Sequence, residues 1–262
     1  MNIIVFIKQV PDIGEVKIDP VTNNLIRQGI PSVVNPFDKN AVEEGLLQRE
    51  KHGGKVTVVT MGPPQAVEAL KECLAVGADE VIHLSDAAFG GSDTLATSKA
   101  LAAAARKIGE YDLIICGKQA TDGDTAQVGP GVAEILGLPQ VTNAVSLSVE
   151  NGTATIKREE DCGYVVLKAK LPMLITVTKI INEPRLPSIK GRMKANRAQI
   201  PVWTAADIGV TREDVGGKAS PTRVAKIFNL TQRTQGEIIK EDSADAAAKR
   251  LISRLSDAGL LA

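Results

Sequence analysis

The sequence has little of what marks several large classes of protein. Aromatic residues make up only 3% of its 262 residues, and Lys plus Arg balance Asp plus Glu at 31 each. So few aromatics do not build a base-stacking platform. A balanced charge also offers no electrostatic attraction for nucleic acid or for an anionic membrane surface. We therefore expect neither nucleic acid nor a membrane among its partners.

Cysteine is scarce, and long apolar runs are missing. Cys73, Cys116 and Cys162 are an odd number at wide spacing, which argues against a disulfide framework and against a Cys-x-x-Cys metal or redox site. No run reaches 18 apolar residues, and the first residues lack the basic region and cleavage site of a secretory leader. We expect a cytoplasmic protein without membrane insertion and without a metal site, in which any redox chemistry comes from a cofactor.

The first part of the chain alternates short apolar runs with helical patterns. Such alternation predicts a doubly wound, mostly parallel sheet with right-handed crossovers, that is, a Rossmann-like α/β fold. The strands are expected at 2–7, 55–60, 80–84 and 111–116, and the helices from about residue 38, over 64–77, over 92–108 and over 125–136.

Beyond Gln140 the pattern changes. Strand-like runs at 141–149, 153–158, 164–168 and 173–178, with the hairpin signal Glu150-Asn151-Gly152, predict antiparallel additions to the sheet. Residues 182–215 are rich in Pro, Arg, Lys and Gly, which favours a long surface excursion over a core element.

The carboxy-terminal residues show one clear helical pattern. A final helix is expected from about Ser243, with Ala244, Ala247, Leu251, Ile252 and Leu255 on one face. The polar segment before it reads as an extended arm that packs on a partner subunit, since it could bury little of itself. A flexible tail is the alternative.

Three polar, glycine-containing segments are expected at one edge of the sheet. They are 35–38, 90–97 and 117–130. In an open parallel sheet, ligands bind beyond the carboxyl ends of the strands, near the switch in strand order. Together the segments outline a nucleotide pocket.

The segment 90–97 has a mechanism for holding an anion. Its glycines admit close backbone approach, Ser92 or Asp93 caps the following helix, and first-turn N–H groups favour a phosphate. Thr94 and Thr97 share a helical face and can add hydroxyl donors. An ordinary loop with a good helix cap explains the same residues equally well.

The segment 117–130 follows a buried strand. Asp122 and Asp124 could accept hydrogen bonds from ribose hydroxyls or an adenine amino group, Thr125 could donate to a phosphate, and Gly123 could admit close approach. An ordinary tight turn is the alternative. A calcium loop is excluded, because no Glu follows at the required distance.

Catalytic side chains do not stand out. His52 lies in a polar loop and His83 in a strand, so both are interpreted as structural or solvated, and no catalytic residue is assigned.

Several motifs carry a family resemblance, and they are in the family's order along nearly the whole chain. The motifs are 5–12, 16–19, 35–38, 61–63, 74–79, 117–119, 182–185 and 193–195. With them, the chain resembles the β subunit of electron transfer flavoproteins. The resemblance implies an adenine nucleotide α-hydrolase-like fold and a heterodimer with a larger α subunit that holds the electron-transferring FAD.

Within this family, one kind of β subunit binds only AMP and the electron-bifurcating kind binds a second FAD. The stretches 91–97 and 122–130 resemble the second kind. That resemblance implies FAD here, with AMP as the alternative, and NAD(H) as a substrate at a site shared with the α subunit. It further implies ferredoxin or flavodoxin as electron acceptor and an acyl-CoA or hydroxy-acid dehydrogenase as partner.

The resemblance also carries site residues. Arg185, Ile189 and Lys194 fall in the family's dehydrogenase recognition loop, with Ile189 at the place of an anchoring leucine, and Phe37 is placed near the partner's flavin. The implied cofactor-binding residues are Phe6, Asn35, Phe37, Asp38, Met61, Ser92, Thr94, Thr97, Cys116, Gly117, Lys118, Gln119, Asp122, Gly123, Asp124, Thr125, Ala126, Gln127 and Val128.

We accordingly expect a nucleotide-binding α/β domain at 1–184, a surface recognition loop and excursion at 185–217, and an arm with a helix at 218–262. Two other classes remain as alternatives. An ATP pyrophosphatase or amidotransferase-like enzyme would need a Ser-Gly-Gly-x-Asp-Ser loop after the first strand, where this chain has Lys8-Gln-Val-Pro11. A universal-stress-type ATP-binding module would not need the basic excursion or the arm.

Overall fold

The computed structural model describes residues 1–12, 32–223, 236 and 238–261. The chain divides into two units, Met1–Ala225 and Lys226–Ala262, which are described separately. The motif at 16–19 and much of the expected arm lie outside the described residues.

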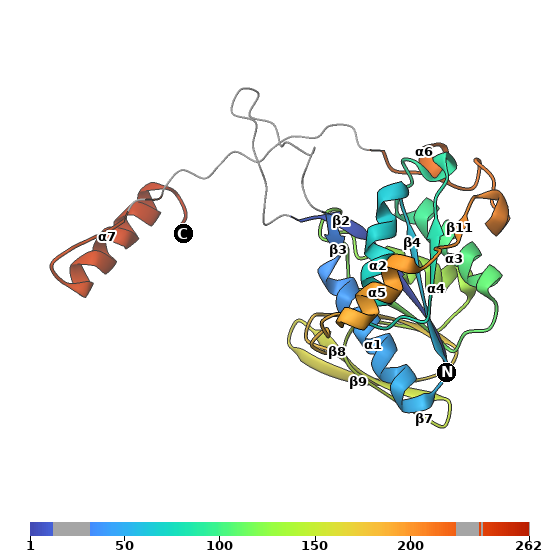
Figure 1. The fold of residues 1–262 in the computed structure, drawn as a ribbon. Coiled ribbons are helices and arrows are strands. Elements are labelled where there is room, and N and C mark those ends of the chain that lie inside the picture. Colours follow the sequence, from blue (N-terminus) through green and yellow to red (C-terminus); the bar gives the residue numbers. More distant parts are fainter. Residues whose placement is uncertain (13–31, 224–235, 237, 262) are drawn as a thin grey trace. The chain divides into compact units, whose positions relative to one another are not determined.

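A large sheet forms the centre of the first unit (Figure 1). Among the described residues it has nine strands in the order β11-β5-β4-β1-β6-β10-β7-β8-β9. Pairing is parallel from β11 to β7 and antiparallel from β7 to β9. The expected Rossmann-like, mostly parallel fold with antiparallel additions is confirmed. The strands are β1 (Asn2–Ile7), β4 (Lys55–Met61), β5 (Glu80–Leu84), β6 (Leu113–Gly117), β7 (Gln140–Glu150), β8 (Thr153–Glu160), β9 (Gly163–Lys170), β10 (Met173–Val177) and β11 (Val202–Trp203).

The central strands are apolar on both faces because helices cover both faces. In β1, Ile3, Val5 and Ile7 pack with one cluster of core residues, and Ile4 and Phe6 pack with the other. The first cluster includes residues of α1 (Pro36–His52) and α2 (Val67–Val76), and the second includes residues of α3 (Thr94–Ile108) and α4 (Val128–Leu136). Period-two alternation along a strand thus separates two hydrophobic cores.

Short elements complete the first half. A two-stranded antiparallel ribbon joins β2 (Gln9–Pro11) to β3 (Ser32–Val34). The 3₁₀ turns η2 (Pro64–Ala66) and η3 (Ala87–Phe89) follow β4 and β5.

The hairpin expected at 150–152 joins β7 to β8, with φ of 50° at Asn151 and 71° at Gly152. Positive φ at both positions is typical of the tight turn that matches strand twist.

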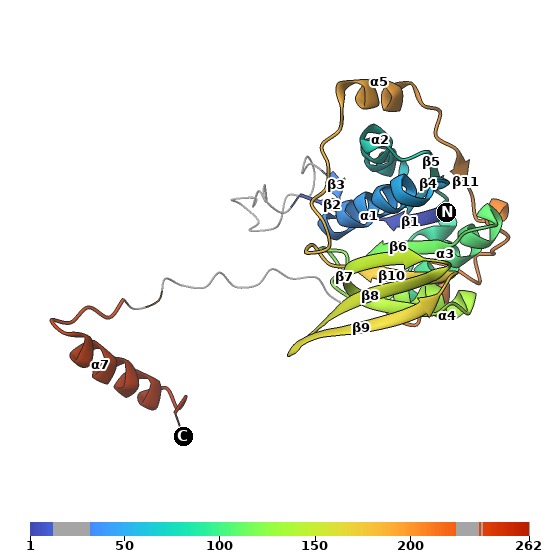
Figure 2. The same ribbon diagram turned by 90° about the horizontal axis from the view of Figure 1, so that it is seen from below.

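The stretch expected as a surface excursion contains short regular elements, although most of its residues are exposed. Ser188 caps α5 (Ile189–Arg197). α5 lies against α2 (Figure 2), and its Ala195 is buried in the core cluster that includes residues of α2. Gly191 permits this packing, because a Cβ there would overlap the carbonyl oxygen of Ala75. Farther along, β11 extends the sheet, and η4 (Ala206–Ile208) and α6 (Gly216–Ala219) follow it. Small residues, which carry little hydrophobic signal, make these contacts.

The second unit contains α7 (Ala244–Asp257). Ser243 caps it by accepting the N–H of Ala246 at 3.2 Å, which confirms the expected helix start. Leu251 and Ile252 are exposed within the described chain. Across the described residues, no helix is both long and apolar enough to cross a membrane.

Candidate cofactor site

The site lies where strand order reverses. From β1 the chain adds β4 and β5 on one side and then returns to add β6 on the other. The carboxyl ends of β1 and β6 therefore open a crevice, and open α/β sheets bind ligands at such a place. Asn35, Asp38 and the loop from Gly117 to Gln127 meet at this crevice.

Asp38 lies buried beneath the crevice. Its carboxylate accepts the main-chain N–H of Lys8 at 2.7 Å, and it is also hydrogen-bonded by the backbone of Gly117. Burial raises the pKa of Asp38 to about 7, although the hydrogen bonds from Lys8, Asn35 and Gly117 oppose that rise. Asp38 therefore ties the ends of β1 and β6 together from below.

Asn35 fixes the beginning of the loop. It is fully buried, its Nδ2 donates to the carbonyl of Gln119 at 2.8 Å, and its Oδ1 accepts the N–H of Thr121 at 3.1 Å. The N–H of Lys118 donates to the carbonyl of Val177 at 2.8 Å. These bonds anchor the loop to α1 and to β10.

Two side-chain pairs shape the outer part of the loop. Lys8 Nζ contacts the Asp122 carboxylate at 2.7 Å, which links the end of β1 to the loop. Gln119 Nε2 donates to Asp124 Oδ1. The two aspartates expected to accept from a ribose or an adenine thus have protein partners here, and both have exposed surface for a ligand.

The loop ends later than the sequence suggests. The expected helix start at Thr125 is wrong, because α4 begins at Val128. Asp124 and Ala126 have φ of 52° and 55°, which breaks the helical path before Gln127. A positive φ is costly for Ala, and backbone strain of this kind gathers at functional sites. Residues 122–127 are exposed.

The N-terminus of α4 is suited to an anion. Among the described residues, no side chain caps it, so the N–H groups of Val128 and Gly129 and the positive end of the helix dipole are available, whereas Pro130 has no N–H to donate. Gly129 lets the helix approach the sheet, because a Cβ there would lie 2.6 Å from Cγ2 of Thr176. The start of α4 is thereby held against the crevice.

The N-terminus of α3 is already occupied by a carboxylate, that of Asp93. Asp93 caps it by accepting the N–H groups of Leu95 and Ala96, each at 3.0 Å. Burial tends to raise the pKa of Asp93, but hydrogen bonds from Ala96, Thr222 and Leu95 outweigh it and hold that pKa at about 2. A bound phosphate would meet this carboxylate, so the geometry favours α4 over α3 as the phosphate-binding helix.

The three hydroxyl residues of the 90–97 segment are placed differently from one another. Ser92 donates to the carbonyl of Phe89 at 2.8 Å and accepts the N–H of Gly216 at 2.9 Å. Thr94 Oγ1 donates to Gln127 Oε1 at 3.1 Å, which joins the start of α3 to the start of α4. Thr97 is half-buried on the same helix.

The apolar residues of the expected site lie mostly in the core. Phe6 and Cys116 are buried at the ends of β1 and β6, and Met61 packs on the same core. Burial raises the pKa of the Cys116 thiol, so it stays neutral. Phe37 is half-buried, with Lys179 Nζ 5.0 Å from its ring centroid.

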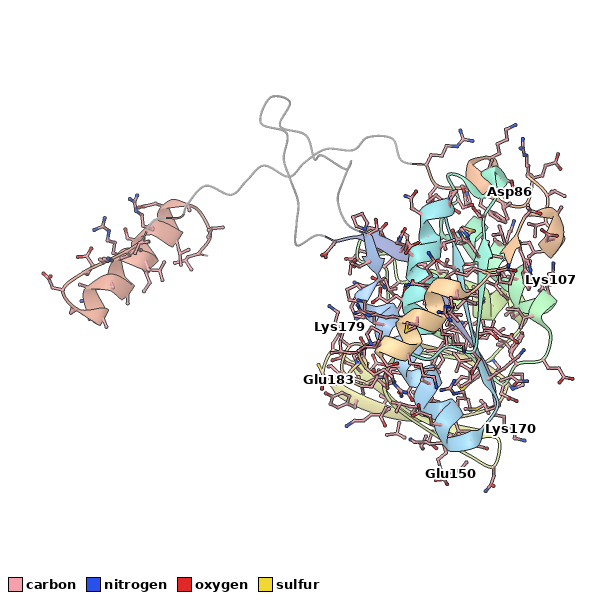
Figure 3. The ribbon with its side chains drawn as sticks, viewed as in Figure 1. Asp86, Lys107, Glu150, Lys170, Lys179 and Glu183 are labelled. Carbon is pink, nitrogen blue, oxygen red and sulfur yellow. The ribbon has the colours of Figure 1, made fainter. Side chains whose placement is uncertain are left out.

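The expected partner-binding residues lie in the segment before α5 and in α5 itself. Arg185 donates to Glu43 at 2.9 Å and to Glu50 at 2.6 Å, and these bonds secure the segment that leads to α5. Ile189 is 83% exposed, beside the exposed Leu186 and Met193. In Figure 3, the labelled Lys179 and Glu183, which precede this segment, lie across the molecule from Asp86 and Lys107.

Sequence reasoning missed three residues that shape the crevice edge. Lys8 pairs with Asp122, and its place directly after a buried strand is a signal that could have indicated it. Ser220 and Thr222 contact the loop before α3 from more than 120 residues away, and no sequence pattern indicates them.

Comparison with known proteins identifies the family. Residues 22–208 match the model of the electron transfer flavoprotein domain. The chain belongs to the electron transfer flavoprotein β-subunit family. It is 48% identical over 257 residues to the electron transfer flavoprotein subunit beta of Clostridium acetobutylicum, with 98% of each chain covered.

Two further relatives have more specific names. The caffeyl-CoA reductase-Etf complex subunit CarD of Acetobacterium woodii is 46% identical over 258 residues, with 98% of each chain covered. The protein FixA of Azorhizobium caulinodans is 43% identical over 265 residues, which cover 97% of this chain and 94% of FixA. Because the chain belongs to the electron transfer flavoprotein family, the pyrophosphatase-like and stress-type alternatives no longer apply. The family gives the chain a role in electron transfer.

Proposed function

We propose that this chain is the FAD-binding β subunit of an electron-bifurcating electron transfer flavoprotein. The uncapped N-terminus of α4, set beside the exposed loop 122–127 at the switch point of the sheet, is the observation that carries the proposal. Backbone N–H groups there suit a phosphate, and the neighbouring hydroxyl, amide and carboxylate groups suit a ribose and a base.

The residues of the crevice fit such a guest in distinct roles. First-turn N–H groups of α4 would hold phosphate, and Asp122 and Asp124 would accept from sugar or base groups. Asn35 and Asp38 would keep the loop in place from below, since their polar groups bond to main-chain atoms of that loop and of β1. Gly117 would let the loop leave β6 beside Asp38, a place where a Cβ does not fit.

One contact supports FAD over AMP. The hydrogen bond from Thr94 to Gln127 joins the starts of α3 and α4 into one polar edge. FAD is longer than AMP by a phosphate, a ribityl chain and a ring system, so an extended edge suits it better. The names of relatives add support, because one is a subunit of a caffeyl-CoA reductase-Etf complex.

The partners follow from the same proposal. The chain would pair with an electron transfer flavoprotein α subunit in a cytoplasmic heterodimer, through the carboxy-terminal residues 218–262. Ile189 and the segment from Arg185 to Lys194 would contact an acyl-CoA or hydroxy-acid dehydrogenase, because Leu186, Ile189 and Met193 expose apolar surface on a secured segment. Phe37 would lie near the partner subunit's flavin.

When bound, FAD would supply the redox chemistry, that is, two-electron exchange with NADH and one-electron exchange with ferredoxin or flavodoxin and, through the α-subunit FAD, with the dehydrogenase. This chain's own residues would bind and orient the cofactor, and they would exclude water from its buried side through the apolar ends of β1 and β6.

The cofactor content of the heterodimer tests the proposal. The chain is copurified with its α subunit, the complex is denatured anaerobically, and FAD and AMP are quantified by chromatography. We expect about two FAD and no AMP per heterodimer. About one FAD with one AMP would contradict the proposal and would make this chain a structural AMP binder, with the flavin chemistry in its partner.

A further inference from the structure

The loop that leads into α3 is held by a segment from the far end of the first unit. Gly217 N–H donates to the carbonyl of Gly90 at 3.0 Å, and Gly216 N–H donates to Ser92 Oγ at 2.9 Å. Ser220 Oγ accepts the N–H of Asp93 at 2.8 Å. We name residues 216–222 together with 88–93 the clasp.

The clasp fits too closely to be a loose contact. A Cβ on Gly216 would overlap the carbonyl oxygen of Ala88, and one on Gly91 would lie 3.4 Å from Cα of Gly217. Gly216 and Gly91 also have φ of 78° and 76°, which L side chains rarely adopt. Ser220 is buried, and its hydroxyl also contacts the carbonyls of Gly216 and Gly91, at 2.9 and 3.3 Å.

The strongest hydrogen bonds of the clasp are accepted by the carboxylate of Asp93, the N-cap residue of α3. Thr222 donates twice to Asp93 Oδ2, from Oγ1 at 2.8 Å and from its main-chain N–H at 3.0 Å. The other carboxylate oxygen, Oδ1, caps α3 by accepting from Leu95 and Ala96. One carboxylate thus joins the first turn of α3 to Thr222, and hydrogen bonds to a charged group are stronger than neutral ones.

The geometry points to Ser220 and Thr222 as positioning residues for the cofactor edge. Thr222 fixes the Asp93 carboxylate, and Ser220 fixes the main-chain N–H of the same residue. Asp93 in turn fixes the first turn of α3 and so places Thr94 to bond with Gln127 at the start of α4. The inference deepens the proposed function, because it names the residues that set the α3 side of the same site.

Cofactor release from the intact heterodimer tests the inference. The variants are Thr222→Val, which removes the hydroxyl but keeps the main-chain donor, and Ser220→Ala. Each heterodimer is held in excess charcoal, and the bound adenine nucleotide that remains is quantified over time, together with the visible absorption spectrum of the bound flavin. We expect release about tenfold faster in both variants, because Thr222→Val loses one hydrogen bond to a charged group and Ser220→Ala leaves the main-chain N–H of Asp93 without its acceptor.

Two controls separate positioning from general destabilisation. Thr222→Ser keeps the hydroxyl and should restore release at the wild-type rate. Thr211→Val is the matched control, because Thr211 donates to Asp214 Oδ2 from Oγ1 at 2.7 Å and from its N–H at 2.9 Å, in the same arrangement away from the crevice. It should release cofactor as the wild type does.

Release at the wild-type rate from both Thr222→Val and Ser220→Ala would overturn the inference. Equal acceleration by Thr222→Val and Thr211→Val would also overturn it. The measurement does not depend on which nucleotide is bound. If the wild-type heterodimer contains AMP in place of a second FAD, the proposed function fails, and the clasp is then tested on AMP release.

Discussion

The carboxylate of Asp38 accepts the main-chain N–H of Lys8 across 2.7 Å, although thirty residues separate the two in the sequence. Lys8 in turn contacts Asp122 through its ammonium group, also at 2.7 Å. A buried carboxylate below the crevice is therefore connected, through one lysine, to an exposed carboxylate at its mouth.

Replacing Asp38 with Asn should change how stability depends on pH. The pKa of Asp38 rises from 3.8 to about 7 on folding, so the folded state binds the proton more tightly than the unfolded chain. Stability from this group is therefore greatest at low pH and is lost as pH rises from 3.8 to about 7, with a slope of up to about 1.4 kcal/mol per pH unit. Asp38→Asn should remove that part of the slope. Urea unfolding at several pH values measures it, and an unchanged slope would contradict the assignment.

Replacing Gly117 with Ala should destabilise the site. The added Cβ would overlap Asp38 Oδ1 and would lie 2.8 Å from Cβ of Phe37. Overpacking of this kind costs about 1–3 kcal/mol of unfolding free energy, and cofactor content should fall with it. Gly123→Ala is the matched control in the same loop, since nothing lies within 4 Å of its Cβ position. Equal effects of the two substitutions, measured by urea unfolding, would refute the prediction.

Replacing Arg185 with Leu should weaken the base of the segment before α5. Its guanidinium bonds with the nearly buried Glu43 and with Glu50, and the hydrogen bond from Arg185 lowers the pKa of Glu50. Because Arg185 is one-third exposed, we expect a loss of only about 2 kcal/mol. Arg185→Lys should recover part of it, since a lysine does not bond to two carboxylates in the same way.

The effect of Arg185→Leu is measured by urea unfolding, with transfer of electrons to the docked dehydrogenase as a second readout. Lys249→Leu serves as the control, because its ion pair with Asp245 on α7 is exposed on both sides. If Lys249→Leu lowered the free energy of unfolding as much as Arg185→Leu does, the burial of Glu43 would not account for the loss of stability.

Replacing Thr94 with Val should lower the FAD content of this subunit. The change removes the hydroxyl that donates to Gln127 Oε1 and separates the starts of α3 and α4. Adding Thr97→Val should lower it further if that hydroxyl contacts the cofactor. Thr94→Ser keeps the donor and should retain FAD. Chromatographic quantification after denaturation decides, and undiminished FAD in the double variant would remove both threonines from the site.

Strands and the tight turn are the features that the sequence predicts well. The strands β1, β4, β5 and β6 are short runs rich in apolar residues, as is typical of strands buried on both faces. The hairpin at 150–152 has its expected turn, because Asn and Gly tolerate positive φ. Local chemistry decides such elements, so a sequence contains the information for them.

Elements decided by distant contacts were not predictable. In α5 only Ala195 is buried, whereas Ile189 and Met193 are exposed, and its packing depends on Gly191 approaching the carbonyl of Ala75. β11 is only two residues long and exists because Val202 and Trp203 pair with His83 and Leu84. The late start of α4 depends on positive φ at Ala126, which its residue type does not favour.

In the candidate site too, the sequence predicts some features, and distant contacts decide the others. Asn35 and Asp38 are on the expected list of cofactor-binding residues, and the structure shows that both bond to main-chain atoms of the crevice. Their supporting role comes from tertiary contacts, which a motif does not display. Direct contact of the remaining expected residues with a cofactor stays a prediction.

The position of β10 has a consequence for synthesis of the chain. β10 lies between β6 and β7, although β7, β8 and β9 all precede it in the sequence (Figure 2). As the polypeptide leaves the ribosome, β6 has no neighbour on that side until residues 173–177 emerge, and the hairpin strands have nothing to join. β10 also brings two residues to the crevice. The carbonyl of Val177 accepts the N–H of Lys118, and Thr176 lies close to Gly129 of α4. The nascent chain therefore cannot complete a cofactor-competent crevice until about two-thirds of it has been made.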